Sequence, residues 1–138
     1  MEEVEAKRLA EEEIKSSEER LEAAEILFKN KKIVDSISRA YYAMFHAARA
    51  LLYLYGIQPR THEGVVREFS RIIIEEKLVD KKFGRSLRQV FEMRESSDYR
   101  VGVILEEEDA KDALEKAKEF VEQVKKVSEK IIAEKFSQ

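Results

Sequence analysis

The sequence of 138 residues contains no cysteine and no tryptophan, and it has only one proline, four glycines and two histidines. Without cysteine the chain has no disulfide framework, no thiolate zinc site and no cysteine nucleophile. The low proline and glycine content excludes collagen-like and linker-like chains. Two histidines leave little for a histidine-rich metal site, and we expect neither a metal nor another cofactor.

Long apolar runs and a basic N-terminal start are missing as well. The longest apolar run is shorter than a membrane span, and acidic residues follow Met1 where a signal peptide would be basic. By elimination we expect a soluble cytoplasmic protein with no membrane partner. The net charge of −3, from 26 basic and 29 acidic residues, gives no global attraction to nucleic acid but allows a local basic cleft. The abundance of Glu, Lys and Arg favours a heat-adapted source, a thermophile.

Apolar residues recur at helical spacing through almost the whole chain, and no segment has the sustained two-residue alternation of a strand. Because the loops are short, neighbouring helices should be mostly antiparallel. The sequence therefore predicts an all-α, five-helix up-and-down bundle, formed as one domain by residues 1–138. The expected helices are residues 2–29, residues 35–55 with Gly56 as the stop, a third capped by Thr61, a fourth from near Asp80, and a fifth from after Gly102 to about Phe136.

The helix expected at residues 35–55 combines a largely apolar surface with one polar stripe. Apolar residues cover most of its circumference, which is typical of the central helix of a bundle. Charged groups on such a helix need water, a carboxylate or a partner chain. We interpret the stripe as a dimer interface or a ligand-binding cleft, with a solvent-exposed or internally hydrogen-bonded seam as the alternative. The stripe consists of Arg39, Tyr42, His46, Arg49 and Tyr53.

A second polar feature lies in the apolar sector of the fourth expected helix, where Arg94 and Asp98 are one turn apart. As a functional site, Asp98 would hold the Arg94 guanidinium for a phosphate or a ribose, with Tyr99 nearby as a stacking or hydroxyl group. The structural alternative is an ion pair that fixes this helix against its neighbours.

Other chemical signatures are missing. The chain has no glycine-rich phosphate-binding loop and no Gly-Lys-Ser/Thr run. Most carboxylates fall on the expected solvent faces of the first and last helices, which favours a charged surface over an acid/base pair or a metal site. His62 follows Thr61 at a helix start, and we expect it to be an exposed residue next to the cap.

Four segments resemble the HEPN domain family (higher eukaryotes and prokaryotes nucleotide-binding), in particular its small stand-alone prokaryotic members. They read SRAYYAMFHAARALL at residues 38–52, HEGVV at residues 62–66, RESSDY at residues 94–99 and AKEFV at residues 117–121. The resemblance covers about residues 14–131. It implies a helical bundle that usually forms a homodimer and is often partnered by a small nucleotidyltransferase, in some cases as a toxin–antitoxin pair.

Many members of this family are metal-independent ribonucleases with an Arg-x4–6-His motif near the dimer axis. Arg94 matches the arginine, but Tyr99 falls in the window of the histidine, and no histidine follows His62. Cleavage without a metal needs an acid/base group that titrates near neutral pH, and tyrosine is a poor substitute for imidazole. His46 is the candidate replacement.

Three functions remain open. The first is a homodimer that partners a small nucleotidyltransferase and binds nucleotide or RNA in a polar cleft. The second is a metal-independent RNase toxin with a degenerate motif, and the third is a purely structural interaction module. The candidate catalytic residues are Arg94, His46 and Tyr99, and the candidate ligand-binding residues are Arg39, Tyr42, Arg49 and Asp98.

Overall fold

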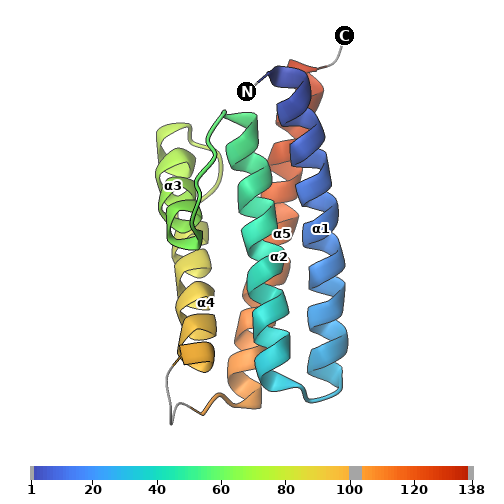
Figure 1. The fold of residues 1–138 in the computed structure, drawn as a ribbon, viewed down its shortest axis with the longest axis vertical. Helices are drawn as coiled ribbons and strands as arrows, with labels where there is room; N and C mark the ends of the chain where they lie inside the picture. The colour runs from blue at the N-terminus through green and yellow to red at the C-terminus, as the bar shows by residue number, and fades with distance from the viewer. Residues whose placement is uncertain (1, 100–103, 137–138) are drawn as a thin grey trace.

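The computed structural model describes residues 2–99 and 104–136, with the backbone alone for residues 98 and 99. These ranges hold five helices and no strand, which confirms the predicted all-α class (Figure 1). The observed bounds lie within a few residues of the predicted ones. The helices are α1 (Glu3–Lys29), α2 (Ile33–Leu54), α3 (His62–Glu75), α4 (Lys82–Tyr99) and α5 (Glu107–Lys135).

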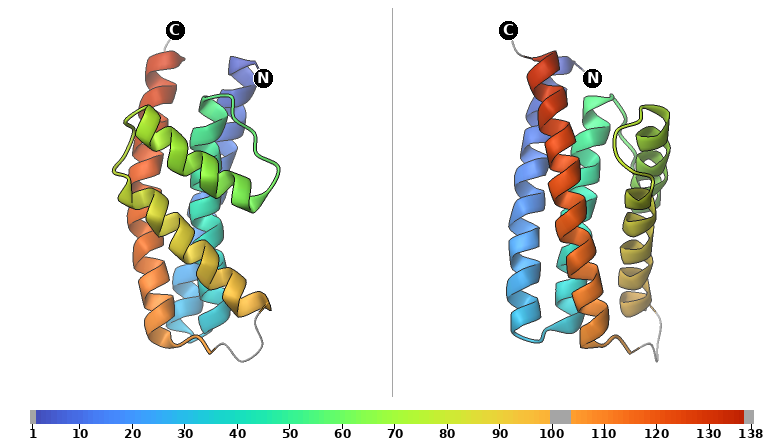
Figure 2. Two further views of the ribbon diagram at one scale, coloured as in Figure 1. Left: turned by 90° about the vertical axis from the view of Figure 1, so that its left-hand side faces the viewer. Right: turned by 180° about the vertical axis from the view of Figure 1, so that it is seen from behind.

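The three long helices stand side by side, and the shorter pair covers one side of them (Figures 1 and 2). α1 runs antiparallel to α2 and α5, while α3 and α4 form a hairpin that crosses α2 obliquely. In the described part of the chain, α2 is the one helix that packs against all four others. This central place agrees with its nearly all-apolar surface.

The helix ends follow local sequence signals. The Thr61 side chain accepts a hydrogen bond of 2.9 Å from the Gly64 backbone N–H, which caps α3 as predicted. Gly56 has a φ of +72°, a left-handed conformation that only glycine adopts at little cost, directly after α2. Glu106 and Asp109 form a reciprocal capping box at the start of α5.

Close helix packing fixes α1 against α2. The Ser17 hydroxyl donates to the Ala43 carbonyl oxygen at 2.6 Å, and the Ser36 hydroxyl donates to the Ala24 carbonyl oxygen at 2.9 Å. Both serines are buried, so these bonds satisfy groups that would otherwise be costly in the core. On the other side of the core, the fully buried Phe120 of α5 packs against α3 and α4.

One line of α2 remains uncovered. From Ser36 to Leu54 every residue is buried except Ser38 and the five residues of the predicted polar stripe. Arg39 is exposed, and Tyr42, His46, Arg49 and Tyr53 are half-buried. None of the described helices is long and apolar enough to cross a membrane.

Candidate functional site

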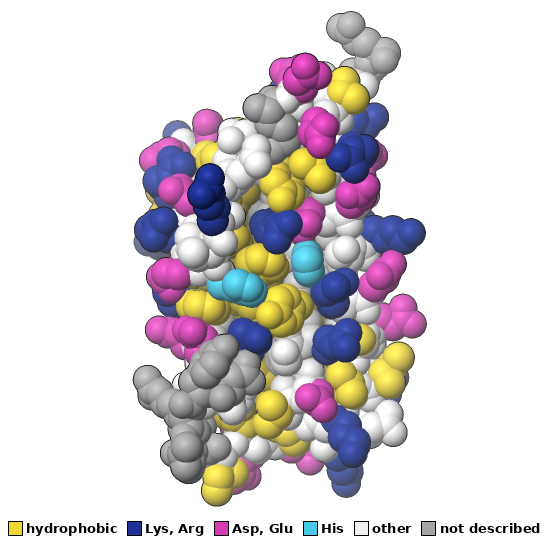
Figure 3. All heavy atoms as spheres, viewed as in Figure 1, with side chains coloured by type: hydrophobic (Ala, Val, Ile, Leu, Met, Phe, Trp, Pro, Cys, Tyr) yellow, Lys and Arg dark blue, Asp and Glu magenta, His cyan; other side chains and the backbone are white. Residues whose placement is uncertain are grey.

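The uncovered line of α2 forms the centre of a surface to which four helices contribute. Figure 3 shows both histidine side chains on this side of the molecule, with hydrophobic side chains between them and basic side chains around them. We call this surface the α2 face. Its members are Glu13 of α1, Tyr42, Phe45, His46 and Arg49 of α2, His62 of α3 and Arg94 of α4.

His46 is tied to α1 through Glu13. Its Nδ1 lies 2.7 Å from Glu13 Oε2, and the two side chains are 16% and 14% exposed. Because a carboxylate can only accept, Nδ1 carries the proton and donates it in this bond. The second carboxylate oxygen of Glu13 accepts from the Arg49 guanidinium at 3.1 Å. One carboxylate thus holds two consecutive residues of the α2 stripe.

Arg49 is also held by aromatic rings. Its guanidinium lies 5.2 Å from the ring centre of Phe45 and 5.6 Å from that of Tyr53, and it donates to the Tyr53 hydroxyl at 3.0 Å. A cation over such rings gains electrostatic attraction and loses conformational freedom. This side chain is therefore fixed before any ligand arrives.

His62 is the first residue of α3 and lies against α2. Its ring stacks on Phe45, with 4.4 Å between centres and an interplanar angle of 16°, and its Nδ1 is 2.7 Å from the Tyr41 hydroxyl. The prediction that His62 is an exposed residue beside the cap is wrong, because the imidazole is half-buried. The seven-residue connection from α2 brings it back onto the aromatic residues of that helix.

The surroundings of His62 favour its neutral form. Burial lowers the pKa of His62 below its ordinary value, and the positive charges of Arg94 and Arg49 lower it further. Burial raises the pKa of the Tyr41 hydroxyl, which therefore stays protonated beside it. A neutral imidazole can accept a proton, so this position is suited to a general base.

α4 contributes Arg94, whose guanidinium lies 4.9 Å from the ring centre of Tyr42 and 5.7 Å from that of Tyr41. Arg94 is half-buried. The structure therefore places the predicted residue beside the α2 stripe. The side chains of Asp98 and Tyr99 lie outside the described residues, so the predicted Arg94–Asp98 pair and the predicted role of Tyr99 stay predictions.

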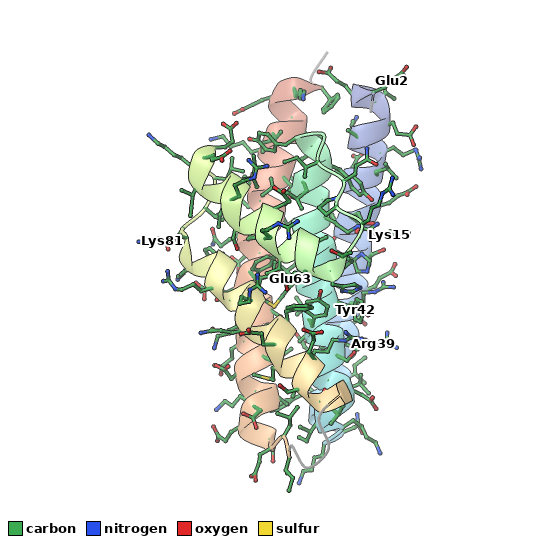
Figure 4. The ribbon with its side chains drawn as sticks, turned by 60° about the vertical axis from the view of Figure 1, so that its left-hand side comes forward. Glu2, Lys15, Arg39, Tyr42, Glu63 and Lys81 are labelled. Carbon is green, nitrogen blue, oxygen red and sulfur yellow. The ribbon has the colours of Figure 1, made fainter. Side chains whose placement is uncertain are left out.

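Arg39 lies at the margin of the α2 face. It is exposed and sits next to Tyr42 along α2 (Figure 4). The other candidates that the structure describes, Tyr42, His46, Arg49 and Arg94, are brought together by ring or ion-pair contacts. In residues 2–97 and 104–136, no group of three or more His, Asp or Glu side chains is arranged to hold a metal ion.

Among the titratable members of the α2 face, sequence reasoning missed Glu13 and His62. Glu13 belongs to a helix full of carboxylates, and its one distinguishing signal is its place beside the buried Ile14. His62 had a clear local interpretation next to a cap. What sets both residues apart is a contact with another helix, which spacing within one helix does not reveal.

Fold and site together define an all-α protein in which a buried central helix presents one line of imidazole, guanidinium and aromatic groups. A family model described as the HEPN domain matches residues 10–127. The chain therefore belongs to the HEPN family, which confirms the resemblance noted from its sequence.

Several relatives match over most of their length. A protein of Methanocaldococcus jannaschii named "putative toxin" is 37% identical over 119 residues, which cover 86% of this chain and 88% of the relative. A second protein of that organism with the same kind of name is 31% identical over 120 residues, 87% and 82% of the two chains. A UPF0332 protein of Thermotoga maritima is 35% identical over 109 residues, 79% and 83% of the two chains.

Proposed function

We propose that this chain is the toxin of a toxin–antitoxin pair and that it binds and cleaves RNA at the α2 face without a metal ion. One observation carries the proposal: two imidazoles and a guanidinium meet around the same aromatic residues. All three groups surround the Tyr42 ring, whose centre is 6.3 Å from that of His46, 5.7 Å from that of His62 and 4.9 Å from the Arg94 guanidinium. The names of two relatives support the toxin part.

RNA carries its own nucleophile, the 2′-hydroxyl, so cleavage needs only proton transfer and charge stabilisation. The neutral His62, with its Nδ1–H donating to the Tyr41 oxygen, takes the proton of the 2′-hydroxyl on Nε2, and the oxygen of that hydroxyl forms a bond to the adjacent phosphorus. The bond from phosphorus to the 5′-oxygen breaks, and protonated His46, paired with Glu13, gives this oxygen its proton. The products are a 2′,3′-cyclic phosphate and a 5′-hydroxyl end.

Arg94 is the residue that stabilises the charge on the phosphate in this proposal. During the attack the phosphate gains negative charge, and a planar guanidinium can donate two parallel hydrogen bonds to its oxygens. The rings of Tyr41 and Tyr42 hold the cation in position before RNA binds. Arg39, exposed at the margin of the α2 face, is available to a neighbouring phosphate.

The assembly of the chain is a further part of the proposal. We propose a homodimer whose antitoxin is a small nucleotidyltransferase, following the resemblance of residues 38–52 and 94–99 to such HEPN proteins. The proposal predicts a gene for a small nucleotidyltransferase beside the gene of this chain. Co-expression of the two, followed by affinity purification and light scattering, tests both points. A monomer that never co-purifies with that protein contradicts them and leaves the cleavage proposal standing.

The cleavage test uses the purified full chain with single-stranded RNA and excess EDTA, at pH 6 to 8. The wild type is expected to release fragments with cyclic phosphate ends. The variants His46→Ala, His62→Ala and Arg94→Ala should each lose about 100-fold or more in rate, as general acid–base and charge-stabilising groups do.

The matched control is Arg71→Ala, which removes an arginine from the exposed side of α3 that pairs with Glu68 and Glu75. It should cleave at the wild-type rate. Equal rates for His62→Ala and the wild type would overturn the assignment of the base. Absence of cleavage by the wild type, together with unimpaired growth of cells that express it, would favour the structural interaction module.

A further inference from the structure

Glu13 is the carboxylate of α1 that is set apart by its burial. Its side chain is 14% exposed, whereas Glu12 is 60% and Glu18 is 50% exposed. Those two neighbours form exposed ion pairs with Arg8 and Lys125. Exposed pairs contribute little to stability, but a largely buried carboxylate has to be compensated by specific partners.

The partners of Glu13 both come from α2. Oε2 accepts from His46 Nδ1 at 2.7 Å, and Oε1 accepts from Arg49 at 3.1 Å. Because both oxygens are engaged, the carboxylate cannot turn away from the imidazole without giving up the guanidinium. Its charge is matched by Arg49 even when His46 is neutral.

The backbone around Glu13 is packed closely against α2. One residue further on, Ile14 is buried, and one turn further on the Ser17 hydroxyl bonds across to Ala43 of α2. On the preceding turn, Ala10 and Ala50 of the two helices are fully buried in one small cluster. This packing fixes the position of Glu13 along the helix axes relative to His46. A residue that orients another side chain needs such a fixed position.

We propose that Glu13 is a positioning residue, which holds His46 with the proton on Nδ1 and so makes Nε2 the nitrogen that gives and takes a proton at the α2 face. This inference rests on the proposed function and adds a residue to it. When protonated His46 gives up its Nε2 proton, the remaining neutral imidazole already has the tautomer that Glu13 accepts from. No reorientation is needed between turnovers.

The tautomer can be measured without an activity assay, through the nitrogen chemical shifts of the imidazoles in the 15N-labelled full chain. In its neutral form, His46 of the wild type should show Nδ1 protonated and Nε2 unprotonated. In Glu13→Leu, His46 should populate both tautomers. In Glu13→Gln the single amide oxygen can accept from Nδ1 only when the amide NH2 faces Arg49, so His46 should keep the wild-type tautomer in part.

Cleavage should follow the tautomer rather than the charge. Glu13→Leu is expected to lose about 100-fold in kcat with KM for RNA little changed, the size of effect that a misplaced group produces. Glu13→Gln, which keeps one acceptor oxygen, should recover part of that loss. The control Glu18→Leu, which breaks only the exposed pair with Lys125, should match the wild type in both readouts.

The outcomes separate this inference from the function on which it rests. A wild-type tautomer in Glu13→Leu overturns the positioning role, whatever the rate of cleavage. A wild type that cleaves no RNA overturns the proposed function, while the tautomer spectra still decide whether Glu13 governs His46. Circular dichroism of each variant excludes unfolding as the cause. If Glu13→Leu does not fold, Glu13→Ala, which also removes the acceptor for His46 Nδ1, serves as the test in its place.

Discussion

The α2 face is built from side chains that are fixed by neighbours before any ligand is present. Arg49 is held by Glu13 and two rings, and Arg94 lies over two tyrosine rings. Such positions depend on the flat shape of the guanidinium as much as on its charge, since only a planar cation packs face to face on a ring and presents two parallel donors.

The first prediction concerns this shape. Arg94→Lys keeps the positive charge but loses the guanidinium that lies over the rings of Tyr41 and Tyr42, and with it the paired donors. We expect kcat/KM for RNA cleavage to fall about 10-fold or more. The cation–π interaction that helps to hold the side chain in place is worth about 1 kcal/mol. Steady-state cleavage rates measure the effect. Arg71→Lys on α3 is the control. An Arg94→Lys variant as active as the wild type would contradict the role of the two parallel guanidinium donors.

The second prediction follows from the lowered pKa of His62, whose first cause is burial. In the unfolded chain His62 regains its ordinary pKa of about 6.5. As the pH falls below that value, the unfolded state takes up this proton before the folded state does. The free energy of unfolding should therefore decrease between the ordinary pKa and the lower pKa of the folded state, with no further loss from this group below it.

Urea unfolding at pH 7.5, 6.5 and 5.5 measures this decrease. His62→Gln removes the titrating group, so its stability should vary less with pH than that of the wild type. The slopes are compared rather than the absolute stabilities, because the variant also changes the hydrogen bond to Tyr41. Parallel curves for the two proteins would contradict the lowered pKa.

Some residues of the α2 face could be predicted from the sequence and others could not. His46, Arg49 and Arg94 could be singled out because polar groups stood on apolar helix faces, a signal visible within one helix. Glu13 and His62 gave no such signal, since their importance comes from contacts with α2. The sequence determines these contacts, but the spacing of residues within one helix does not reveal which turns of two different helices pack together.

Among the helices, α3 is the element that sets the position of His62, because this histidine is its first residue. The predicted cap at Thr61 is confirmed, and the fourth helix begins beside Asp80, whose carboxylate accepts from the Lys82 backbone N–H at 2.8 Å. Local signals thus predicted where helices begin. They did not predict that the α3–α4 hairpin crosses α2 obliquely (Figure 2), since crossing depends on how side chains of two helices interdigitate.

The third prediction tests whether the cap of α3 supports the site. Thr61→Ala removes the acceptor for the Gly64 N–H and should cost about 1 kcal/mol of unfolding free energy. Fraying of the first turn should also displace His62 and lower the rate of cleavage. Thr61→Ser keeps the hydroxyl and should resemble the wild type in both measurements. If Thr61→Ala and Thr61→Ser were equally stable in urea unfolding, the cap would contribute nothing.

For the whole molecule, the central place of α2 was predictable because its surface is almost entirely apolar. The charge balance was less informative, since a net charge of −3 does not reveal that Arg39, Arg49 and Arg94 belong to one side of the fold. That grouping comes from packing α4 beside α2. Composition describes an average over the surface, whereas ligand binding depends on where the charges gather.

The fourth prediction asks whether the chain unfolds as the single domain that its length and spacing predict. Phe120 of α5 is fully buried, 5.0 Å from Phe69 of α3 and 6.2 Å from Phe83 of α4 between ring centres. Phe120→Ala should therefore lower the free energy of unfolding by about 3–5 kcal/mol. Ile26→Ala, at a position that is 54% exposed, should lower it by less than about 0.5 kcal/mol. In one domain, helix content by circular dichroism and tyrosine fluorescence should lose their signals at the same urea concentration, shifted equally in Phe120→Ala. Two separate transitions would mean that the α3–α4 hairpin folds apart from the long helices, and the α2 face would then exist only when both parts are assembled.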